Sequence, residues 1–540
     1  GYRRNNIRLN VDNTLGGNWT MAVRTYYAKI ANDNNRGTDF FRITRQPAFV
    51  DLLRRDKFGR LFYRSVVTQE GIQNQNPAYN FEQDRDKNEN DRFQGSTTLR
   101  WQPASWIDGQ FDFGFDKSNN QRRYQTNIGT RANASSSTTY LGSSNRTGGF
   151  GQSYNASVSA TARHDLFRDL TGRMTLRANY EQADNNSDNQ GGTVLAVDGL
   201  TTTNNTTQNF SIGSSESSQR AIGLIVSTNF EYKERYIVDL SIRRDGLSVF
   251  GAAHRWQSYG RGSLAWRTSE ESWYPKSVAK VVNEFKARYS IGQAGNRPGN
   301  TSQYETFTIG TGGVLNPSTL GNKMLAPEVS TEVEMGFDAE VLHRYGLTVT
   351  KSRNITTDQI LLVTPPAAAG FSQQWKNAGT LEGNVWEVSL NLPLIERRDF
   401  NLSTRATYDQ IRSKITKLDI PTQYYSCGSA QCRYSLGEEL GTMYGRRFMQ
   451  FCEQLPAAFA SRCGGAGKEF QKNDNGLIVW TGGAGLGEGI TKNLWNAQLP
   501  AALAPYGVEA SWGMPISVRD SLSTNSPKSV ALLPVGKALP

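Results

Sequence analysis

The stretch at residues 110–116, Q-F-D-F-G-F-D, alternates apolar and polar side chains at every second position. Successive side chains of a β-strand point to opposite faces, so a period of two predicts a strand with one aromatic and one polar face. A one-residue shift in register would exchange the two faces completely. We expect one face to carry Phe111, Phe113 and Phe115, and the other to carry Asp112 and Asp116.

The same alternation recurs along most of the chain and predicts about fourteen strands. Many of them have ten or more residues, whereas strands of soluble domains usually have about five or six. The first two strands flank a Gly16-Gly17 turn and predict a hairpin. The clearest alternating segments lie at residues 7–11, 19–23, 111–116, 174–180, 222–230, 236–242, 285–291, 333–339, 345–349, 386–392 and 400–408.

The predicted connections alternate between short turns and long polar segments. This alternation is typical of a transmembrane β-barrel, which has short turns at one rim and long extracellular loops at the other. The linker near 249–254 is an exception, because it is short where a long loop is expected. Two segments rich in Asn, Ser, Thr and Gly, 119–149 and 184–217, are predicted to be loops.

The composition agrees with a barrel and excludes several other classes. Only 37% of the 540 residues are hydrophobic, although aromatic residues reach 11%. No apolar run approaches the roughly 18 residues that a membrane-spanning helix needs. A closed barrel needs only one apolar face per strand, toward lipid, and its polar faces suit a water-filled or plugged lumen. We therefore predict an all-β, transmembrane antiparallel barrel portion, with strands and loops at 1–412 and a long extracellular, Cys-containing loop region at 413–540.

The charged and histidine residues give no support for nucleic-acid binding or catalysis. The net charge is +11, but the basic residues occur as isolated doublets separated by carboxylates, so we exclude a nucleic-acid partner. His164, His254 and His343 lie far apart without a catalytic pattern. We predict that the chain is not an enzyme and needs no metal or cofactor.

The four cysteines fall in one Gly-rich and Ser-rich stretch and are absent from the first 426 residues. Their spacing does not match a zinc site, so we expect disulfides and an oxidising compartment. Three pairings are possible, and the short loops favour Cys427 with Cys432 and Cys452 with Cys463.

Several ordered motifs resemble one known family. From Glu234 the chain reads E-R-Y-I-V-D-L-S-I-R-R-D-G-L-S-V-F-G, and an aromatic strand ending in A-W-R follows at Trp266 and Arg267. Together with F-K-A-R-Y-S-I-G-Q-A-G-N from Phe285 and P-E-V-S-T-E-V-E-M-G from Pro327, these motifs resemble the SusC/RagA family of TonB-dependent outer-membrane transporters. The resemblance covers residues 220–450 closely and the rest loosely.

The resemblance implies a function, a location and partners. Members import oligosaccharides or peptides across the outer membrane of Gram-negative-type bacteria, with a SusD-like surface lipoprotein as lid and TonB as motor. It implies a barrel of about 22 strands, of which we expect this chain to hold about fourteen, without the plug, the TonB-contacting N-terminal segment and the closing strands. Aromatic loop residues that suit contact with a glycan or peptide substrate are Trp375, Tyr424, Tyr425 and Tyr444.

Two alternatives remain open at this level. A non-functional, truncated remnant of a transporter would show the same motifs. A secreted or surface-exposed β-rich binding protein would show the same alternation, although its strands would be shorter.

Overall fold

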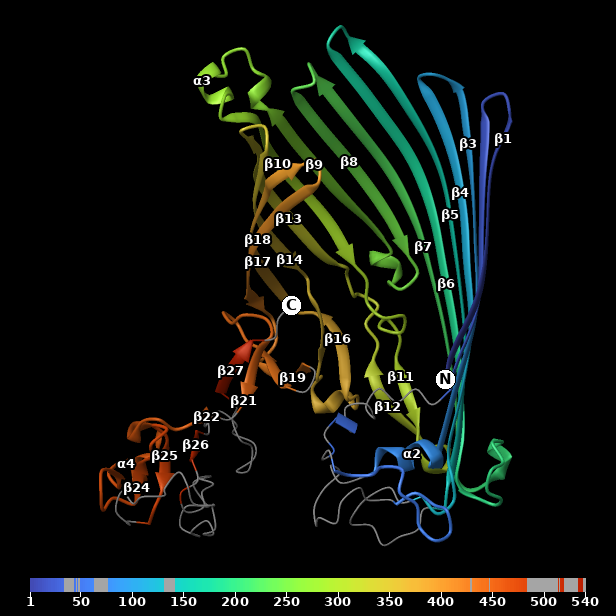
Figure 1. Cartoon of the computed structure of the whole chain (residues 1–540), viewed down its shortest axis with the longest axis vertical. Helices are drawn as coiled ribbons and strands as arrows, with labels where there is room; N and C mark the ends of the chain where they lie inside the picture. Colours follow the sequence, from blue (N-terminus) through green and yellow to red (C-terminus); the bar gives the residue numbers. More distant parts are fainter. Residues whose placement is uncertain are drawn as a thin grey trace.

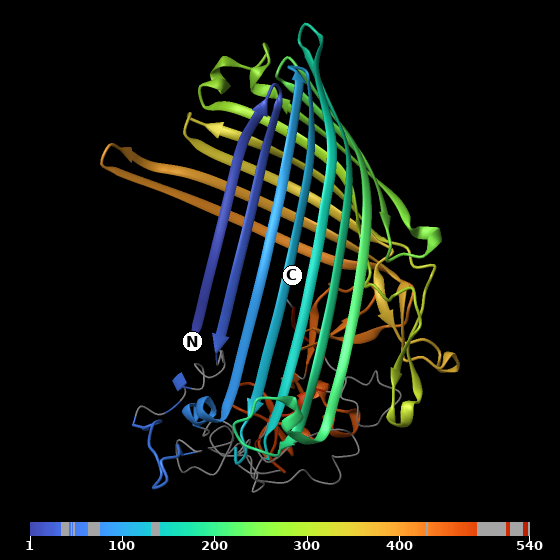
Figure 2. The same ribbon diagram turned by 90° about the vertical axis from the view of Figure 1, so that its right-hand side faces the viewer.

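The computed structural model describes residues 1–33, 43–44, 46, 49–62, 76–130, 141–427, 430–445, 447–482, 513, 515–518 and 533–537. Its main feature is one antiparallel sheet of fourteen strands, in which each strand pairs with the next large strand along the chain. The sheet curls into a barrel wall that is not closed (Figures 1 and 2). The sequence-based count of about fourteen strands is therefore confirmed.

The fourteen strands follow one another as hairpins of differing length. They are β1 (Tyr2–Gly16), β2 (Trp19–Asp33), β3 (Asp84–Ala104), β4 (Ile107–Thr126), β5 (Ser143–Phe167), β6 (Leu170–Leu195), β7 (Thr206–Tyr232), β8 (Tyr236–Leu247), β9 (Trp256–Arg267), β10 (Val282–Asn296), β13 (Glu328–Val341), β14 (Tyr345–Thr357), β17 (Gly379–Arg397) and β18 (Phe400–Leu418).

The strands from β4 to β7 are longer than expected. Residues 119–126, 143–149, 184–195 and 206–217 were predicted to be loop, but they continue the strands, which reach 27 residues in β7. The prediction was wrong because these segments carry few apolar side chains, Phe210 and Ile212 among them, and a strand is recognised in sequence mainly by a longer run of alternating apolar residues. Their backbone ladders nevertheless run from the turns to the loops, with a register shift between Gly191 and Thr193 in the β6–β7 pairing.

The pairing register separates the two faces as the sequence predicts. Phe111 pairs with Leu99 on β3 and Val158 on β5, whereas Asp112 pairs with Thr98 and Ser157. The hydroxyls of Thr98 and Ser157 donate hydrogen bonds to the Asp112 carboxylate at 2.8 and 3.2 Å. One face of the wall is thus apolar and the other carries a polar network.

Within the described residues, no second layer of protein covers the apolar face. Leu240 is 51% exposed, Ile242 65% and Leu176 48%. A soluble sandwich would bury such residues between two sheets, so this exposure excludes the sandwich alternative and fits a wall whose apolar face meets lipid.

The connections hold small sheets and short helices. The additional strands are β11 (Thr306–Ile309), β12 (Leu315–Leu320), β15 (Ile360–Val363), β16 (Gln373–Asn377), β19 (Gln423–Cys427), β20 (Ala430–Tyr434), β21 (Thr442–Gly445), β22 (Arg447–Phe448), β23 (Cys463–Gly464), β24 (Phe470–Lys472), β25 (Ile478–Trp480), β26 (Ser517–Val518) and β27 (Leu533–Lys537). The α-helices are α2 (Pro77–Gln83), α3 (Lys276–Ala279) and α4 (Ala457–Ala460), and the 3-10 helices are η2 (Thr203–Asn205), η3 (Ala252–His254), η4 (Thr268–Glu270), η5 (Thr311–Gly313), η6 (Ala367–Ala369) and η7 (Cys452–Gln454). The helices in the described residues are too short for any of them to span a bilayer.

The boundary expected at residue 412 lies inside a strand, because β18 continues to Leu418. Beyond β18, part of the region 413–540 lies outside the described residues. What is described there forms short strands at the same end of the wall as the other long connections (Figure 1).

Candidate functional site

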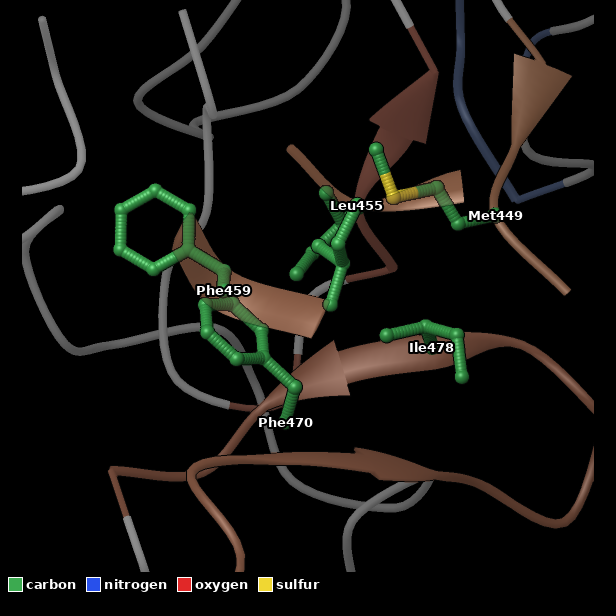
Figure 3. Close-up of a cluster of buried hydrophobic side chains, with 6 residues drawn as sticks. Met449, Leu455, Phe459, Phe470 and Ile478 are labelled. Carbon is green, nitrogen blue, oxygen red and sulfur yellow. The ribbon is translucent and has the colours of Figure 1, made fainter. Parts of the chain in front are cut away.

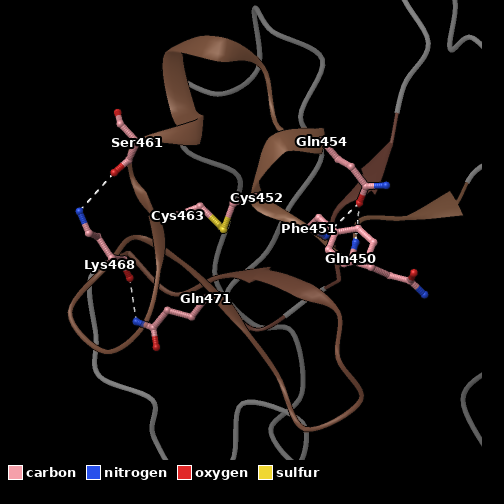
Figure 4. Close-up of a disulfide and its surroundings, with 8 residues drawn as sticks. All are labelled: Gln450, Phe451, Cys452, Gln454, Ser461, Cys463, Lys468 and Gln471. Atoms are coloured by element: carbon pink, nitrogen blue, oxygen red, sulfur yellow. Dashed lines mark hydrogen bonds between the residues drawn. A yellow bond between two sulfur atoms is a disulfide. The ribbon is translucent and has the colours of Figure 1, made fainter.

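Two disulfides stabilise the described part of the region after β18. Cys427 is bonded to Cys432, with Cα atoms 5.8 Å apart, and Cys452 to Cys463, with Cα atoms 5.5 Å apart. The first closes the β19–β20 hairpin, and the second joins η7 to β23 (Figure 4). This is the pairing that the short loops favoured in the sequence.

A four-stranded sheet, β19-β20-β21-β27, carries three of the four candidate aromatic residues. Tyr424 lies opposite Arg433, and Tyr444 lies opposite Gln431, so Tyr424, Arg433 and Tyr444 share one face. Tyr425 lies on the other face because it is the next residue along β19. We call this sheet the rim sheet.

An ion pair and an aromatic stack organise the first face of the rim sheet. The Arg433 guanidinium lies over the Tyr444 ring, 4.3 Å from its centroid, and its Nε donates to the Glu438 carboxylate at 3.1 Å. The Tyr444 hydroxyl donates to the same carboxylate. Tyr424 packs edge-on against Tyr444, with ring centroids 5.9 Å apart.

These contacts set the protonation states on the rim sheet. The hydrogen bond from Arg433 and the one from Tyr444 hold the pKa of Glu438 below its ordinary value, against the opposing effect of burial. Burial, followed by the hydrogen bond to Glu438, raises the pKa of Tyr444. Glu438 is therefore a carboxylate and Tyr444 a protonated phenol at neutral pH.

The four candidate residues differ in how open they are. Tyr424 is 41% exposed, whereas Tyr444 is only 5% exposed. Tyr425 is half-buried and stacks on Tyr434, with ring centroids 4.2 Å apart. Of the three tyrosines, Tyr424 thus presents the most open aromatic surface, and Tyr444 supports it from below.

The second face of the rim sheet rests on the connection between β14 and β17. Tyr434 packs against a buried cluster formed by Leu361, Val363 and Ala378. The Gln423 side-chain amide also donates to the Leu362 carbonyl oxygen at 2.8 Å. The rim sheet is therefore anchored to the wall through β15.

Trp375 lies on a different sheet, β11-β12-β16-β15. It pairs with Leu362, so it faces away from Leu361 and Val363, which contact Tyr434. The Asn322 side chain donates to the Trp375 carbonyl oxygen at 2.9 Å. The structure does not bring Trp375 onto the face that carries Tyr424.

A second compact unit follows the rim sheet. Its buried side chains come from the segment around η7 and α4 and from β24 and β25, and most are labelled in Figure 3. The Gln471 side chain, which is fully buried, donates to the Lys468 carbonyl oxygen at 2.7 Å (Figure 4). We call this compact unit the disulfide unit, and its core consists of Met449, Leu455, Phe459, Phe470, Ile478 and Ile516.

Sequence reasoning missed Arg433, Tyr434 and Glu438. A local signal existed, because Arg433 and Tyr434 follow directly after Cys432 in a hairpin closed by its own disulfide. A short polar strand of this kind has no periodicity long enough to assign faces.

Comparison with known proteins places these features in a family. Residues 25–431 match the family described as TonB dependent receptor-like, beta-barrel. The chain belongs to this family of TonB-dependent receptors. Its wall is therefore the β-barrel of a TonB-dependent receptor, a family of the Gram-negative outer membrane.

Individual relatives agree with this membership. The chain is 30% identical over 231 residues to TonB-dependent receptor P39 of Formosa agariphila, an alignment that covers 41% of this chain and 22% of that receptor. It is 27% identical over 207 residues to TonB-dependent receptor SusC of Bacteroides thetaiotaomicron, covering 35% of this chain and 20% of SusC.

Solved structures show the same fold. The RagAB peptide transporter superimposes with a TM-score of 0.69 and 16% identity, covering 83% of this chain and 51% of the matched chain. This chain thus spans about half the length of that transporter chain, and its curated relatives align over about a fifth of theirs.

Proposed function

We propose that the receptor containing this chain imports oligosaccharides or peptides across the outer membrane, driven by TonB, as a SusC-like transporter. The observation that supports this most is the family match across residues 25–431, because it includes both the wall and its loop-side connections. In this proposal the polar face of the wall surrounds the plug, and the loop-side sheets meet the substrate.

A SusD-like lipoprotein is the proposed partner at the loop-side rim. The support is the likeness to SusC in sequence and to a RagAB complex in fold. The rim sheet and the disulfide unit both lie at the loop-side end of the wall, where such a lid would close (Figure 1).

Tyr424 is the proposed substrate contact within the rim sheet. An exposed aromatic ring stacks on the flat apolar face of a sugar or on a peptide side chain, while polar groups at its edge donate and accept hydrogen bonds. Tyr444 and Tyr425 position the surface around it, and Trp375 would contact substrate from a separate sheet.

An uptake assay that depends on the proton gradient tests the proposal. Cells that carry the receptor are given fluorescent oligosaccharide or peptide pools, with and without a proton-gradient uncoupler. We expect gradient-dependent accumulation of one pool and not the other. Uptake that is equal in cells lacking the receptor would contradict the transport function.

A pair of variants tests the site. Tyr424→Ala should reduce the affinity for the imported pool by about fivefold, because aromatic stacking on a ligand is worth roughly 1 kcal/mol. Tyr180→Ala removes a tyrosine that is 37% exposed on the apolar face of β6 and serves as the matched control. Equal losses in both variants would remove Tyr424 from the site.

A further inference from the structure

The apolar face of β14, β17 and β18 changes character abruptly toward the loops. In register, Val349 lies beside Val388, and Val388 beside Tyr408. In the next row toward the loops, Lys351 lies beside Trp386. In the row after that, Asn384 lies between Arg353 and Arg412. In the third row, Glu382 lies between Ile355 and Lys414. Alternation along each strand places all these side chains on the outward face of the wall.

Four cations therefore gather on three neighbouring strands, and we call them the outer basic patch: Lys351, Arg353, Arg412 and Lys414. All four side chains are exposed. Glu382 is the carboxylate among them, and Arg353 binds it through two hydrogen bonds of 3.0 Å. The patch thus retains an excess of positive charge.

The residues beside the outer basic patch indicate its level in the membrane. Trp386 is 42% exposed and Tyr408 57%, and the Lys351 ammonium lies over the Trp386 ring, 4.9 Å from its centroid. Exposed Trp and Tyr side chains mark the boundary between the acyl chains and the headgroups. Cations directly on the loop side of such a row lie at the level of the headgroups of the outer leaflet.

An outward cation on β2 has a carboxylate partner on the neighbouring strand. On β2 and β3, the row beyond Tyr27 and Phe93 joins Lys29 to Asp91, whose charged groups lie 3.9 Å apart. This cation already has a carboxylate partner. Lys29 is therefore a matched control position for the outer basic patch.

We propose that the outer basic patch binds the phosphorylated headgroup of an anionic lipid in the outer leaflet. The patch offers the ammonium groups of Lys351 and Lys414 and the guanidinium of Arg412. Among the described residues, Arg412 has no carboxylate within ion-pair distance, whereas Arg353 is paired with Glu382. These three cations match a phosphate in charge and hydrogen bonding. The acyl chains of the same lipid would lie along Val388 and Tyr408, which face outward in the adjacent row.

Direct binding of lipid A, a phosphorylated outer-leaflet lipid, tests this inference. The receptor purified from outer membranes is titrated with lipid A in dodecylmaltoside, and the bound lipid is counted by native mass spectrometry. The triple variant K351Q/R412Q/K414Q should weaken binding by about a hundredfold, since each basic residue near an anionic lipid surface contributes roughly a fivefold factor. The control K29Q should bind as the wild type does. Unchanged binding in the triple variant, or an equal loss in K29Q, overturns the proposal.

A gain-of-binding variant guards against misfolding. E382Q removes the carboxylate and releases Arg353, so lipid A should bind several-fold more tightly, which a folding defect cannot produce. Inorganic phosphate at 10 mM should not displace the lipid, because phosphate lacks the acyl chains. Complete displacement would show that the patch is a general anion site, which overturns the proposal. Weaker lipid A binding by a correctly folded E382Q variant would also overturn it.

Discussion

The barrel wall and the disulfide unit are built on opposite principles within one chain. In the wall, large apolar side chains such as Ile242, which is 65% exposed, lie open, and the strands are held by long backbone ladders. In the disulfide unit, Phe470 and Ile516 are completely buried, and a covalent bond joins Cys452 to Cys463.

The difference follows from the surroundings of each region. Hydrocarbon solvates apolar side chains but not backbone groups, so the wall needs complete backbone pairing and no core. Water solvates the backbone but not apolar side chains, so a small unit at the rim needs a core, and a core this small needs a covalent bond in addition.

The largest expected effect comes from breaking a wall ladder. Ala178 lies between Val158 on β5 and Leu224 on β7, and Ala178→Pro removes a backbone donor in a central strand. The substitution removes a ladder hydrogen bond and leaves a carbonyl unpaired in lipid, which costs roughly several kcal/mol. The folded barrel band on unboiled gels should disappear, whereas Ala178→Val should retain it. A folded Ala178→Pro barrel would mean that the ladder does not hold the wall.

The second effect should be confined to the disulfide unit. Phe470→Ala leaves a cavity in its core and should destabilise it by about 3 to 5 kcal/mol, without affecting the wall. Trypsin cleavage within residues 447–482 should accelerate at least a hundredfold while the folded barrel band persists. Phe448, which is 49% exposed, is the matched control, and Phe448→Ala should leave the cleavage rate unchanged.

Removing the covalent bond should have a somewhat smaller effect. The double variant Cys452→Ser with Cys463→Ser opens a loop with a sequence separation of 11, which the chain-entropy account values at about 3 kcal/mol. Cys427→Ser with Cys432→Ser opens a separation of 5 and should cost about 2 kcal/mol. Hydrogen exchange of each segment measures both losses. The opposite ranking would show that loop closure is not the main contribution.

The smallest effect concerns pH and the rim sheet. Because Arg433 and Tyr444 lower the pKa of Glu438 in the folded state, its contribution is present above the ordinary Glu pKa and is lost as pH falls through the folded-state value. Glu438→Gln should therefore weaken hydrogen-exchange protection of residues 430–445 at pH 7. The difference from wild type should vanish at low pH. A difference that persists there would exclude the carboxylate charge as its cause.

Sequence patterns predicted the wall well where one face is apolar. The alternation around Phe111 and around Leu240 assigned both the strands and their faces, because a one-residue shift would put carboxylates into lipid. It failed for residues 143–149, S-S-N-R-T-G-G, which are strand although both faces are polar. There the backbone ladder of the neighbouring hairpins, not local side-chain pattern, extends the strand.

The rim was less predictable than the wall. The cysteine spacing indicated the disulfides correctly, because short loops close most readily. It did not indicate that Tyr444 would be buried under Arg433, since that depends on the pairing of β20 with β21. Contacts between short strands of this kind are set by tertiary packing.

The length of β7 has a consequence for how the cell presents this receptor to its surroundings. A strand of 27 residues extends about 90 Å, or roughly 70 Å in height at a tilt near 40°. The apolar band of an outer-membrane barrel takes up only about 25 Å of that height. The hairpin tip between Leu195 and Thr206 therefore projects roughly tens of ångströms above the membrane surface. We expect antibodies, phages and neighbouring cells to meet this tip before they reach the membrane surface.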